Sequence, residues 1–274
     1  MFIIKNHRIA IIAGNRFFPI LFAQNLRKKV KNIEIIGICF KGETSKKILP
    51  YLDKAYWISV GKLTKLKEIL KKECITQCVM VGQITPLKIF KKNYVDEEFL
   101  KIIKDIDFRP HQIFSKIIKY LENEGINFLN STLYLEEYLA TEGIMNDVDV
   151  SEDVEKNINF GMGIVRNYVQ LDIGQTVVVK MRSVVALETI EGTDKTLLRA
   201  YKLAGRGCVV LKFSKPDQDL RFDVPIVGIS TLKILNKIKA ATLVLEAGRV
   251  LILEKEKFFR LSKKYKIPIV GIKN

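Results

Sequence analysis

Short apolar runs alternate with amphipathic segments along most of the chain, which predicts strands alternating with helices. The strands expected in the first half are Ile9–Ala13, Glu34–Cys39, Gln77–Val81 and Ile126–Leu129, and the expected helices are Phe18–Lys29, Lys62–Lys72, Asp96–Ile106 and Gln112–Glu124. Buried parallel strands read as continuous apolar runs, and their crossovers are usually helical. The first half is therefore expected to be a Rossmann-like α/β domain.

The second half continues the α/β pattern in a more mixed order. The expected helices are Glu152–Tyr168, Lys195–Lys202, Thr231–Lys239 and Lys255–Tyr265, and the expected strands are Thr176–Met181, Val184–Glu188, Cys208–Phe213, Leu243–Leu245, Val250–Leu253 and Ile267–Ile272. Helices and strands alternate here too, which is typical of α/β construction. We expect a C-terminal mixed α/β domain.

A shift in charge marks the expected domain boundary. No basic residue occurs between Lys119 and Lys156, whereas acidic residues crowd the second part of that interval. We place the boundary at residue 133, which gives domains 1–133 and 134–274 and a helix over Leu133–Ala140. An acidic helix inside one larger domain is the alternative interpretation.

The positive net charge indicates which kinds of partner the protein is expected to bind. The chain has 274 residues and a formal net charge of +16, and residues 1–133 alone hold 24 basic and 12 acidic side chains. Such an excess favours an anionic partner, namely a nucleotide, a nucleic acid or an anionic bilayer, although scattered lysines also serve solubility. Clustered arginines with interleaved aromatics, which sequence-reading proteins use, are not evident.

Several classes of protein are disfavoured by what the sequence lacks. Its four cysteines are scattered and it has only two histidines, so neither a disulfide scaffold nor a zinc site is expected. The serine-hydrolase and zincin motifs are missing. No apolar stretch approaches the length of a membrane span, and a cytoplasmic protein is expected.

Two glycine-containing turns follow predicted strands. AGNRFFP, from Ala13 to Pro19, follows the first strand, and VGQITP, from Val81 to Pro86, follows the third. Backbone N–H groups at such turns bind phosphate in α/β folds. Neither turn matches the dinucleotide or Walker pattern, so a nucleotide crevice and two ordinary strand-to-helix turns both remain open.

The segment KPDQDLRFDVP, from Lys215 to Pro225, is the richest in candidate chemistry. If it is extended, alternation places Asp217, Asp219, Arg221 and Asp223 on one face. Carboxylate oxygens suit Mg²⁺ or Mn²⁺, and arginine suits phosphate. The segment thus indicates half of a metal-assisted phosphoryl-transfer site, with a solvated strand as the alternative.

A third candidate motif is ETIEGTD, from Glu188 to Asp194, which leaves a strand and enters a helix. Thr193 or Asp194 is expected to cap that helix. A helix start preceded by a glycine can also bind an anion.

Together with LDIGQTVVV and LEAGRVLIL, these motifs resemble those of the LpxI family in order and spacing over nearly the whole chain. The resemblance implies hydrolysis of UDP-2,3-diacylglucosamine to 2,3-diacylglucosamine 1-phosphate (lipid X) and UMP, a step of lipid A biosynthesis, with Mg²⁺ or Mn²⁺. It implies catalytic roles for Asp219, Arg221 and Asp223, with both aspartates as metal ligands. The implied substrate-binding residues are Gly14, Asn15, Gly82, Glu191, Gly192, Thr193, Asp194 and Lys215.

The same resemblance implies peripheral contact with the inner-membrane surface, because the substrate is a two-chain lipid. It implies no nucleic acid as partner and is compatible with a homodimer. The chain departs from the family's glycine-rich first turn at Asn15 and Arg16. A basic α/β protein that binds nucleotide or nucleic acid without chemistry is the main alternative, and a dinucleotide-dependent oxidoreductase is a third.

Overall fold

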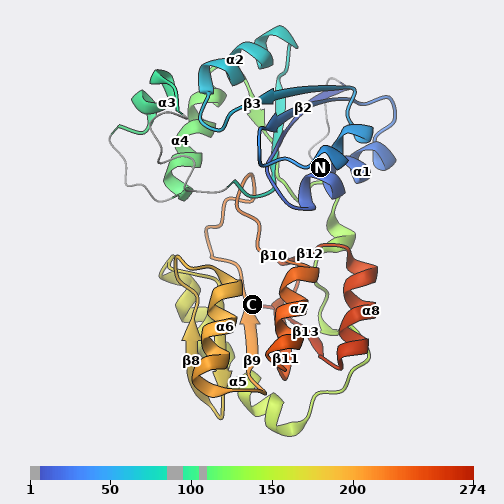
Figure 1. Ribbon diagram of the computed structural model, residues 1–274, viewed down its shortest axis with the longest axis vertical. Helices are drawn as coiled ribbons and strands as arrows, with labels where there is room; N and C mark the ends of the chain where they lie inside the picture. Colours follow the sequence, from blue (N-terminus) through green and yellow to red (C-terminus); the bar gives the residue numbers. More distant parts are fainter. Residues whose placement is uncertain (1–6, 85–94, 105–109) are drawn as a thin grey trace. The chain divides into compact units, whose positions relative to one another are not determined.

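The computed structural model describes residues 7–84, 95–104 and 110–274 and divides into two compact units (Figure 1). The first unit comprises Met1–Leu135 with Asp219–Asp223, and the second comprises Glu136–Gln218 and Val224–Asn274. Residues 219–223 thus lie in the first unit, although a single division at residue 133 assigns them to the second domain. Each unit has its own sheet and helices, which confirms the two-domain α/β fold class.

The sheet of the first unit contains five parallel strands in the order β3-β2-β1-β4-β5. They are β1 (Arg8–Ala13), β2 (Glu34–Phe40), β3 (Lys54–Ile58), β4 (Gln77–Val81) and β5 (Asn127–Phe128). The strand order reverses between β1 and β4. In open parallel sheets this switch point, at the carboxyl ends of the strands, is where ligands bind.

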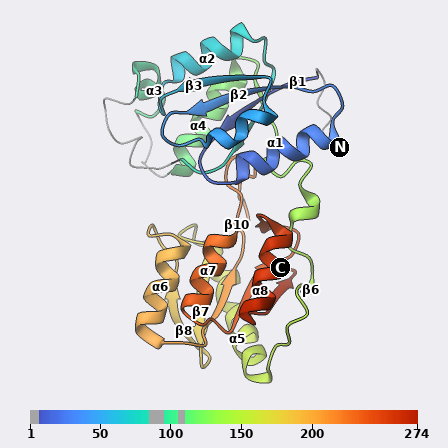
Figure 2. The same cartoon turned by 45° about the vertical axis from the view of Figure 1, so that its right-hand side comes forward.

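Helices cover both faces of this sheet (Figure 2). One face carries α1 (Phe18–Lys29) and the 3₁₀ helix η1 (Lys46–Tyr51), and the other carries α2 (Leu63–Lys72), α3 (Glu97–Ile102) and α4 (Pro110–Asn123). Ala10 and Ile12 of β1 pack with α2 to α4. Ile9 and Ile11 are equally buried and, by strand alternation, face the opposite side. Burial on both faces explains the continuous apolar runs of the sequence.

Strand β3 and η1 were not predicted. Ala55, Tyr56 and Trp57 of β3 are only partly buried, because β3 is the edge strand of the sheet. An edge strand needs no continuous apolar run, so its signal in the sequence is weak. The expected helix over Asp96–Ile106 is shorter, as α3, and its last two residues lie outside the described ranges.

The prediction of a helix over Leu133–Ala140 was wrong. The structure has the three-residue 3₁₀ helix η4 (Glu136–Tyr138), followed by a segment paired with the chain near Leu251. The Ala140 N–H donates to Val250 O (2.9 Å), and the Gly248 N–H donates to Ala140 O (2.8 Å). Because these tertiary hydrogen bonds occupy the backbone groups, the segment does not continue as an α-helix.

The second unit contains a six-stranded sheet, ordered β6-β13-β11-β9-β7-β8, and a separate pair, β10-β12. The strands are β6 (Gly143–Ile144), β7 (Thr176–Lys180), β8 (Ser183–Leu187), β9 (Val209–Lys212), β10 (Ile226–Val227), β11 (Thr242–Glu246), β12 (Leu251–Ile252) and β13 (Ile269–Ile272). β9, β11 and β13 are parallel, whereas β6, β7 and β8 join antiparallel. The mixed α/β domain expected here is confirmed, and its sheet combines parallel and antiparallel strands.

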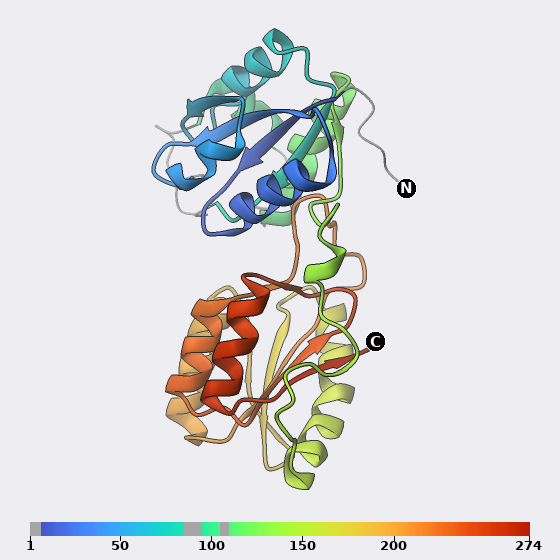
Figure 3. The same cartoon turned by 90° about the vertical axis from the view of Figure 1, so that its right-hand side faces the viewer.

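Helices also cover both faces of the six-stranded sheet (Figure 3). α5 (Glu152–Gln170) lies on one face, and α6 (Thr193–Ala204), α7 (Ile229–Lys237) and α8 (Lys255–Tyr265) lie on the other. Val177 and Val179 pack with α5, whereas the intervening Val178 packs with the helices of the opposite face. Alternate side chains of one strand thus belong to two separate apolar cores.

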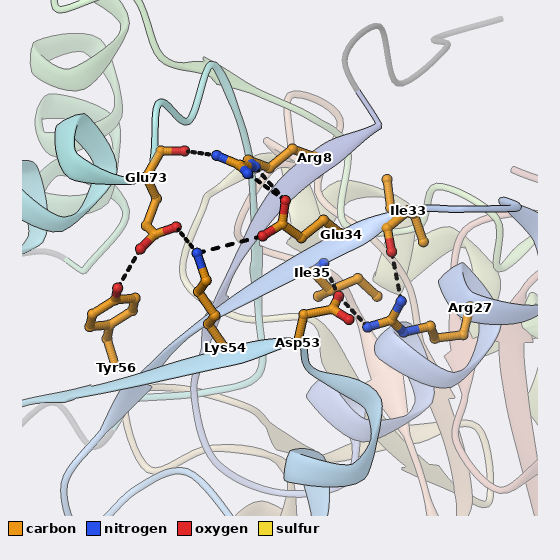
Figure 4. Close-up of polar contacts among 9 residues, drawn as sticks. All are labelled: Arg8, Arg27, Ile33, Glu34, Ile35, Asp53, Lys54, Tyr56 and Glu73. Atoms are coloured by element: carbon orange, nitrogen blue, oxygen red, sulfur yellow. Dashed lines mark hydrogen bonds and ion pairs between the residues drawn. The ribbon is translucent and has the colours of Figure 1, made fainter.

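A polar network connects the amino ends of β1, β2 and β3 (Figure 4). Arg8 Nε donates to Glu34 Oε2 (2.7 Å), and Arg8 Nη1 donates to Glu73 O (2.7 Å). The buried Glu73 carboxylate accepts from Lys54 Nζ (2.8 Å) and from the Tyr56 hydroxyl, and these bonds lower its pKa. The charged groups at this amino edge therefore stabilise the fold. A functional site is expected at the carboxyl edge instead.

A second network connects α2, α3 and α4. Glu98 of α3 accepts hydrogen bonds from Lys67 Nζ of α2 (2.5 Å) and from the Tyr120 hydroxyl of α4, and Lys67 Nζ also donates to the Tyr120 oxygen (2.7 Å). The hydrogen bonds from Lys67 and Tyr120 lower the pKa of Glu98 to about 2. One carboxylate thereby connects three helices of the same face.

Replacing Glu98 by Gln is predicted to lower the free energy of unfolding at pH 7 by about 1–2 kcal/mol. The pKa of Glu98 is lower in the folded state than in the unfolded chain, where it is about 4.3. Its contribution is therefore complete above that value and is lost as the pH falls toward about 2. Urea unfolding at pH 7 and pH 3 measures this.

The matched control is Glu68→Gln, because Glu68 pairs with Lys65 on the surface of α2 with both side chains more than half exposed. This variant should lose less than about 0.5 kcal/mol. A difference between wild type and Glu98→Gln that is as large at pH 3 as at pH 7 would contradict the assignment.

Candidate functional site

The two glycine-containing turns meet at the switch point of the first sheet. The Gly14 N–H donates to Val81 O (2.8 Å), and the Asn15 N–H donates to Gln83 O (2.7 Å). β1 and β4 are neighbouring parallel strands, so both turns lie at the carboxyl edge, as the nucleotide-crevice interpretation required. Pro86, the last residue of the second turn, lies outside the described ranges.

The glycines of these turns allow the two backbones to approach each other. A Cβ on Gly14 would lie 2.5 Å from Gln83 O, and a Cβ on Gly82, whose φ is +89°, would lie 2.7 Å from Asn15 O. The Asn15 amide nitrogen donates to Glu43 (2.6 Å), whereas none of the described residues donates to its buried Oδ1. Nucleotide contacts by Gly14, Asn15 and Gly82 stay a prediction.

The segment from Lys215 to Pro225 is not extended, so the face on which Asp219, Arg221 and Asp223 were expected to alternate does not exist. The Asp223 N–H donates to Asp219 O (2.9 Å), and the Arg221 N–H donates to the Asp219 side chain (3.0 Å). Aspartate side chains commonly stabilise turns by bonding to the backbone two residues on. Asp219, Arg221 and Asp223 therefore belong to a turn, which hydrogen bonds to Asp219 stabilise.

This turn is anchored at the carboxyl edge of the first sheet. Ser131, which follows β5 and is fully buried, donates its N–H to Leu220 O (2.9 Å). The Ser131 hydroxyl lies 2.5 Å from Met80 O of β4 and 2.7 Å from Arg221 O. Phe222 packs against His111 and Phe114 of α4, with ring centroids 5.3 and 5.8 Å apart.

Arg221 lies between two carboxylates. Its Nε and Nη2 donate to both oxygens of Asp219 (2.7 to 3.1 Å), and its Nη1 donates to Glu122 (2.6 Å). Burial acts to raise the pKa of Asp219, but the hydrogen bonds from Arg221 bring it below its usual value. Among the described residues, none forms a hydrogen bond or ion pair with the Asp223 carboxylate, which is available for a ligand or a water molecule.

In the second unit, polar side chains gather around Thr193, the first residue of α6. Gly192, with a φ of +81°, is the N-cap and no side chain caps the helix, so the expected cap by Thr193 or Asp194 was wrong. The Thr193 hydroxyl instead donates to Glu188 (2.9 Å) and accepts from Lys212 Nζ (2.9 Å). Lys212 Nζ is 3.8 Å from Glu188, and both side chains are almost buried.

The neighbouring motif residues have partners within the second unit. Arg199 donates to Glu191 (Nε, 3.0 Å), and this hydrogen bond lowers the pKa of Glu191. Asp194 accepts from the Thr231 hydroxyl (3.3 Å), and Lys215 pairs with Asp172 (2.6 Å). Glu191 and Lys215, both predicted to contact substrate, are thus held by opposite charges.

Further polar groups lie at the carboxyl ends of β9 and β11. Glu246, the last residue of β11, accepts from the Ser214 N–H (2.6 Å). Gln218 accepts from the Lys215 N–H (3.0 Å), and its buried Nε2 donates to none of the described residues. Lys212 and Glu246 each follow directly on three apolar residues of their strand. A buried charge at the end of an apolar run is the signal that could have identified both.

The structure divides the predicted site residues between the units. Gly14, Asn15, Gly82, Asp219, Arg221 and Asp223 belong to the first unit, and Glu191, Gly192, Thr193, Asp194 and Lys215 belong to the second. Within residues 7–84, 95–104 and 110–274, no three His, Cys, Asp or Glu side chains lie close enough together to hold a metal ion. Five further polar residues near these groups were not predicted from the sequence: Glu122, Glu188, Lys212, Ser214 and Glu246.

The fold and the site residues define a two-domain α/β protein with anionic and cationic side chains at the carboxyl edge of the parallel strands in each unit. Family models match both halves, the LpxI N-terminal domain over residues 8–138 and the LpxI C-terminal domain over residues 141–270. The chain belongs to the LpxI family, as the motifs indicated.

One curated relative is the UDP-2,3-diacylglucosamine pyrophosphatase LpxI of Caulobacter vibrioides, which is 23% identical over 277 residues and is matched over 97% of each chain. Among solved structures, the biotin carboxylase domain of Hydrogenobacter thermophilus 2-oxoglutarate carboxylase has a TM-score of 0.30 and 10% identity, over 72% of this chain and 41% of that one. A score this low does not support a shared fold.

Proposed function

We propose that this protein hydrolyses the pyrophosphate bond of UDP-2,3-diacylglucosamine, giving 2,3-diacylglucosamine 1-phosphate and UMP for lipid A biosynthesis. The observation that carries the proposal is the match of LpxI domain models to both halves of the chain. The name of the Caulobacter relative, matched from end to end, adds the substrate and the reaction. Binding of nucleotide without chemistry is the outcome that the activity test must exclude.

In this proposal, Asp223 orients the attacking water. Its carboxylate is free of partners among the described residues, whereas the Asp219 carboxylate is engaged on both oxygens by Arg221. A carboxylate that accepts a proton from water must have an oxygen available for it. Asp219 and Arg221 support this role by forming the turn that presents Asp223.

In the second unit, Lys212, Thr193 and Lys215 are proposed to lie along the pyrophosphate. The Lys212 ammonium is nine-tenths buried, and among the described residues its one hydrogen-bond partner within 3 Å is the Thr193 hydroxyl. The amino end of α6 adds the positive end of a helix dipole. Charge that develops on phosphate oxygens is stabilised by such preorganised groups.

A divalent cation is also part of the proposal, and Asp223 has the chemistry to bind one. Mg²⁺ is commonly held by one or two carboxylates together with substrate phosphates, so a cluster of three protein ligands is not required. Asp219 fits less well, because Arg221 already occupies its oxygens. When bound, the cation would neutralise charge on the pyrophosphate oxygens.

Contact with the bilayer surface is proposed because the substrate carries two acyl chains. In the described part of the chain, no helix combines the length and apolar character that crossing a bilayer requires. The basic excess of residues 1–133, 24 basic against 12 acidic side chains, would attract the protein to anionic headgroups.

Replacing Asp223 by Ala should lower kcat by at least ~10²-fold, because a positioned acid, base or metal ligand is lost. Release of UMP from UDP-2,3-diacylglucosamine dispersed in detergent with Mg²⁺ measures this. Asp217→Ala is the matched control, since Asp217 is exposed in the same segment. A near-normal rate for Asp223→Ala would remove Asp223 from the mechanism, and the absence of UMP with the wild type would refute the proposed reaction.

Activity should vanish in EDTA and return on addition of Mg²⁺ or Mn²⁺, because the proposed ligand is a hard oxygen donor. The UMP assay on protein dialysed exhaustively against chelator tests this, with Ca²⁺ and Zn²⁺ as comparisons. Full activity after chelation would contradict metal assistance.

Binding to vesicles should depend on anionic lipid and on salt. Each cation near the surface contributes about 1 kcal/mol, and high ionic strength screens it. Cosedimentation with anionic and neutral vesicles at low and high salt measures the binding. Equal pelleting under all conditions would indicate an apolar contact, and no pelleting with anionic vesicles at low salt would refute the proposed membrane contact.

A further inference from the structure

Four of the five residues from Asp219 to Asp223 are fixed by contacts within the first unit. Asp219 and Arg221 pair with each other, the Leu220 carbonyl accepts from Ser131, and Phe222 packs against α4. Asp223 differs, because among the described residues only its backbone N–H has a partner, Asp219 O. The position of the Asp223 carboxylate therefore depends on how its neighbours hold the turn.

Arg221 forms one contact within the turn and one between the turn and α4. The pair with Asp219 lies inside the turn and moves with it, whereas the bond from Nη1 to Glu122 (2.6 Å) connects the turn to α4. Ser131 and Phe222 hold the backbone, and Glu122 is the one acidic side chain of the described residues outside the turn that binds the guanidinium. The Arg221–Glu122 hydrogen bond thus adds a polar contact between the turn and α4 to the aromatic contacts of Phe222.

Glu122 is itself held by a rigid element. It lies next to Leu121 near the end of the 14-residue helix α4, and Leu121 and Ile118 are completely buried in the core. The side chains of Glu122 and Arg221 are each about one-third exposed, so the pair lies at the surface of the unit where the turn emerges. An ion pair in such a place adds little stability but can fix a direction.

We propose that Glu122 is a positioning residue of the reaction, which acts through Arg221 to aim the Asp223 carboxylate. This inference rests on the proposed function. Glu122 lies 99 residues before Arg221, in a helix that none of the motifs includes. Displacement of a reacting group by about 1 Å can cost ~10²-fold in rate, so a bond of this kind affects kcat more than substrate affinity.

The experiment compares Glu122→Ala, Glu122→Gln and the control Glu124→Ala, in the full chain. Glu124 lies two residues further and pairs with Lys71 (3.1 Å), so it matches Glu122 in charge and neighbourhood. Glu122→Ala should lower kcat by ~10- to 100-fold with a much smaller change in KM, and Glu122→Gln, which keeps an acceptor for Nη1, should fall between. Glu124→Ala should keep the wild-type kcat.

A second measurement reports on the turn without using activity. Hydrogen exchange of the Asp223 amide, which is bonded to Asp219 O, should be faster in Glu122→Ala than in wild type or Glu124→Ala. In an Arg221→Met background, Glu122→Ala should cost nothing further in kcat, because the partner through which it acts is gone. Additive losses in kcat would overturn the inference.

The outcomes separate the inference from the function on which it rests. If the wild type releases UMP and Glu122→Ala keeps the wild-type kcat, Glu122 has no positioning role and the proposed reaction stands. A loss of kcat without faster exchange at Asp223 would also overturn the inference. If the wild type releases no UMP, the proposed reaction is refuted, and the role of Glu122 in it is refuted as well, whatever the exchange rates show.

Discussion

The insertion of five residues from the second half of the chain into the first unit is the constraint on which the site depends. Buried Ser131 bonds to the backbone of these residues, and Phe222 adds an aromatic contact to α4. As a result, the chain passes between the units at three places, after residues 135, 218 and 223. The proposed catalytic carboxylate of Asp223 thereby belongs to the first unit, whereas the chain on either side of residues 219–223 belongs to the second.

Charged residues have different roles at the amino ends and at the carboxyl ends of the strands. At the amino ends of β1 to β3, Arg8, Glu34, Lys54 and Glu73 neutralise one another and connect strands. At the carboxyl ends, the Asp223 carboxylate of the first unit has no partner among the described residues, and Lys212 of the second is held by the Thr193 hydroxyl. Parallel strands bring the ends of several segments together at one edge, so this edge can be polar while the interior stays apolar.

The arrangement also explains why one motif can contain residues of unlike function. In KPDQDLRFDVP, Lys215 and Gln218 bond within the second unit, Asp219 and Arg221 shape the turn, and Phe222 anchors it. The Asp223 carboxylate has no hydrogen-bond or ion-pair partner in the part of the chain that the structure describes. A uniform assignment of all polar residues to catalysis overlooks this division. Hydrogen-bond partners, rather than residue type, separate the supporting side chains from those available to a substrate.

The sequence by itself determined the α/β class, most strands and helices and the family, because apolar periodicity and motif order are local properties. It did not determine β3, an edge strand with weak periodicity. Nor did it determine the conformation of residues 133–140, whose backbone pairs with the chain near Leu251. Period-two spacing suggested an extended face for Asp219, Arg221 and Asp223, but the hydrogen bonds of Asp219 formed a turn. The contacts of this turn with Ser131, Glu122 and α4 join segments about 90 to 110 residues apart, and only tertiary folding brings such groups together.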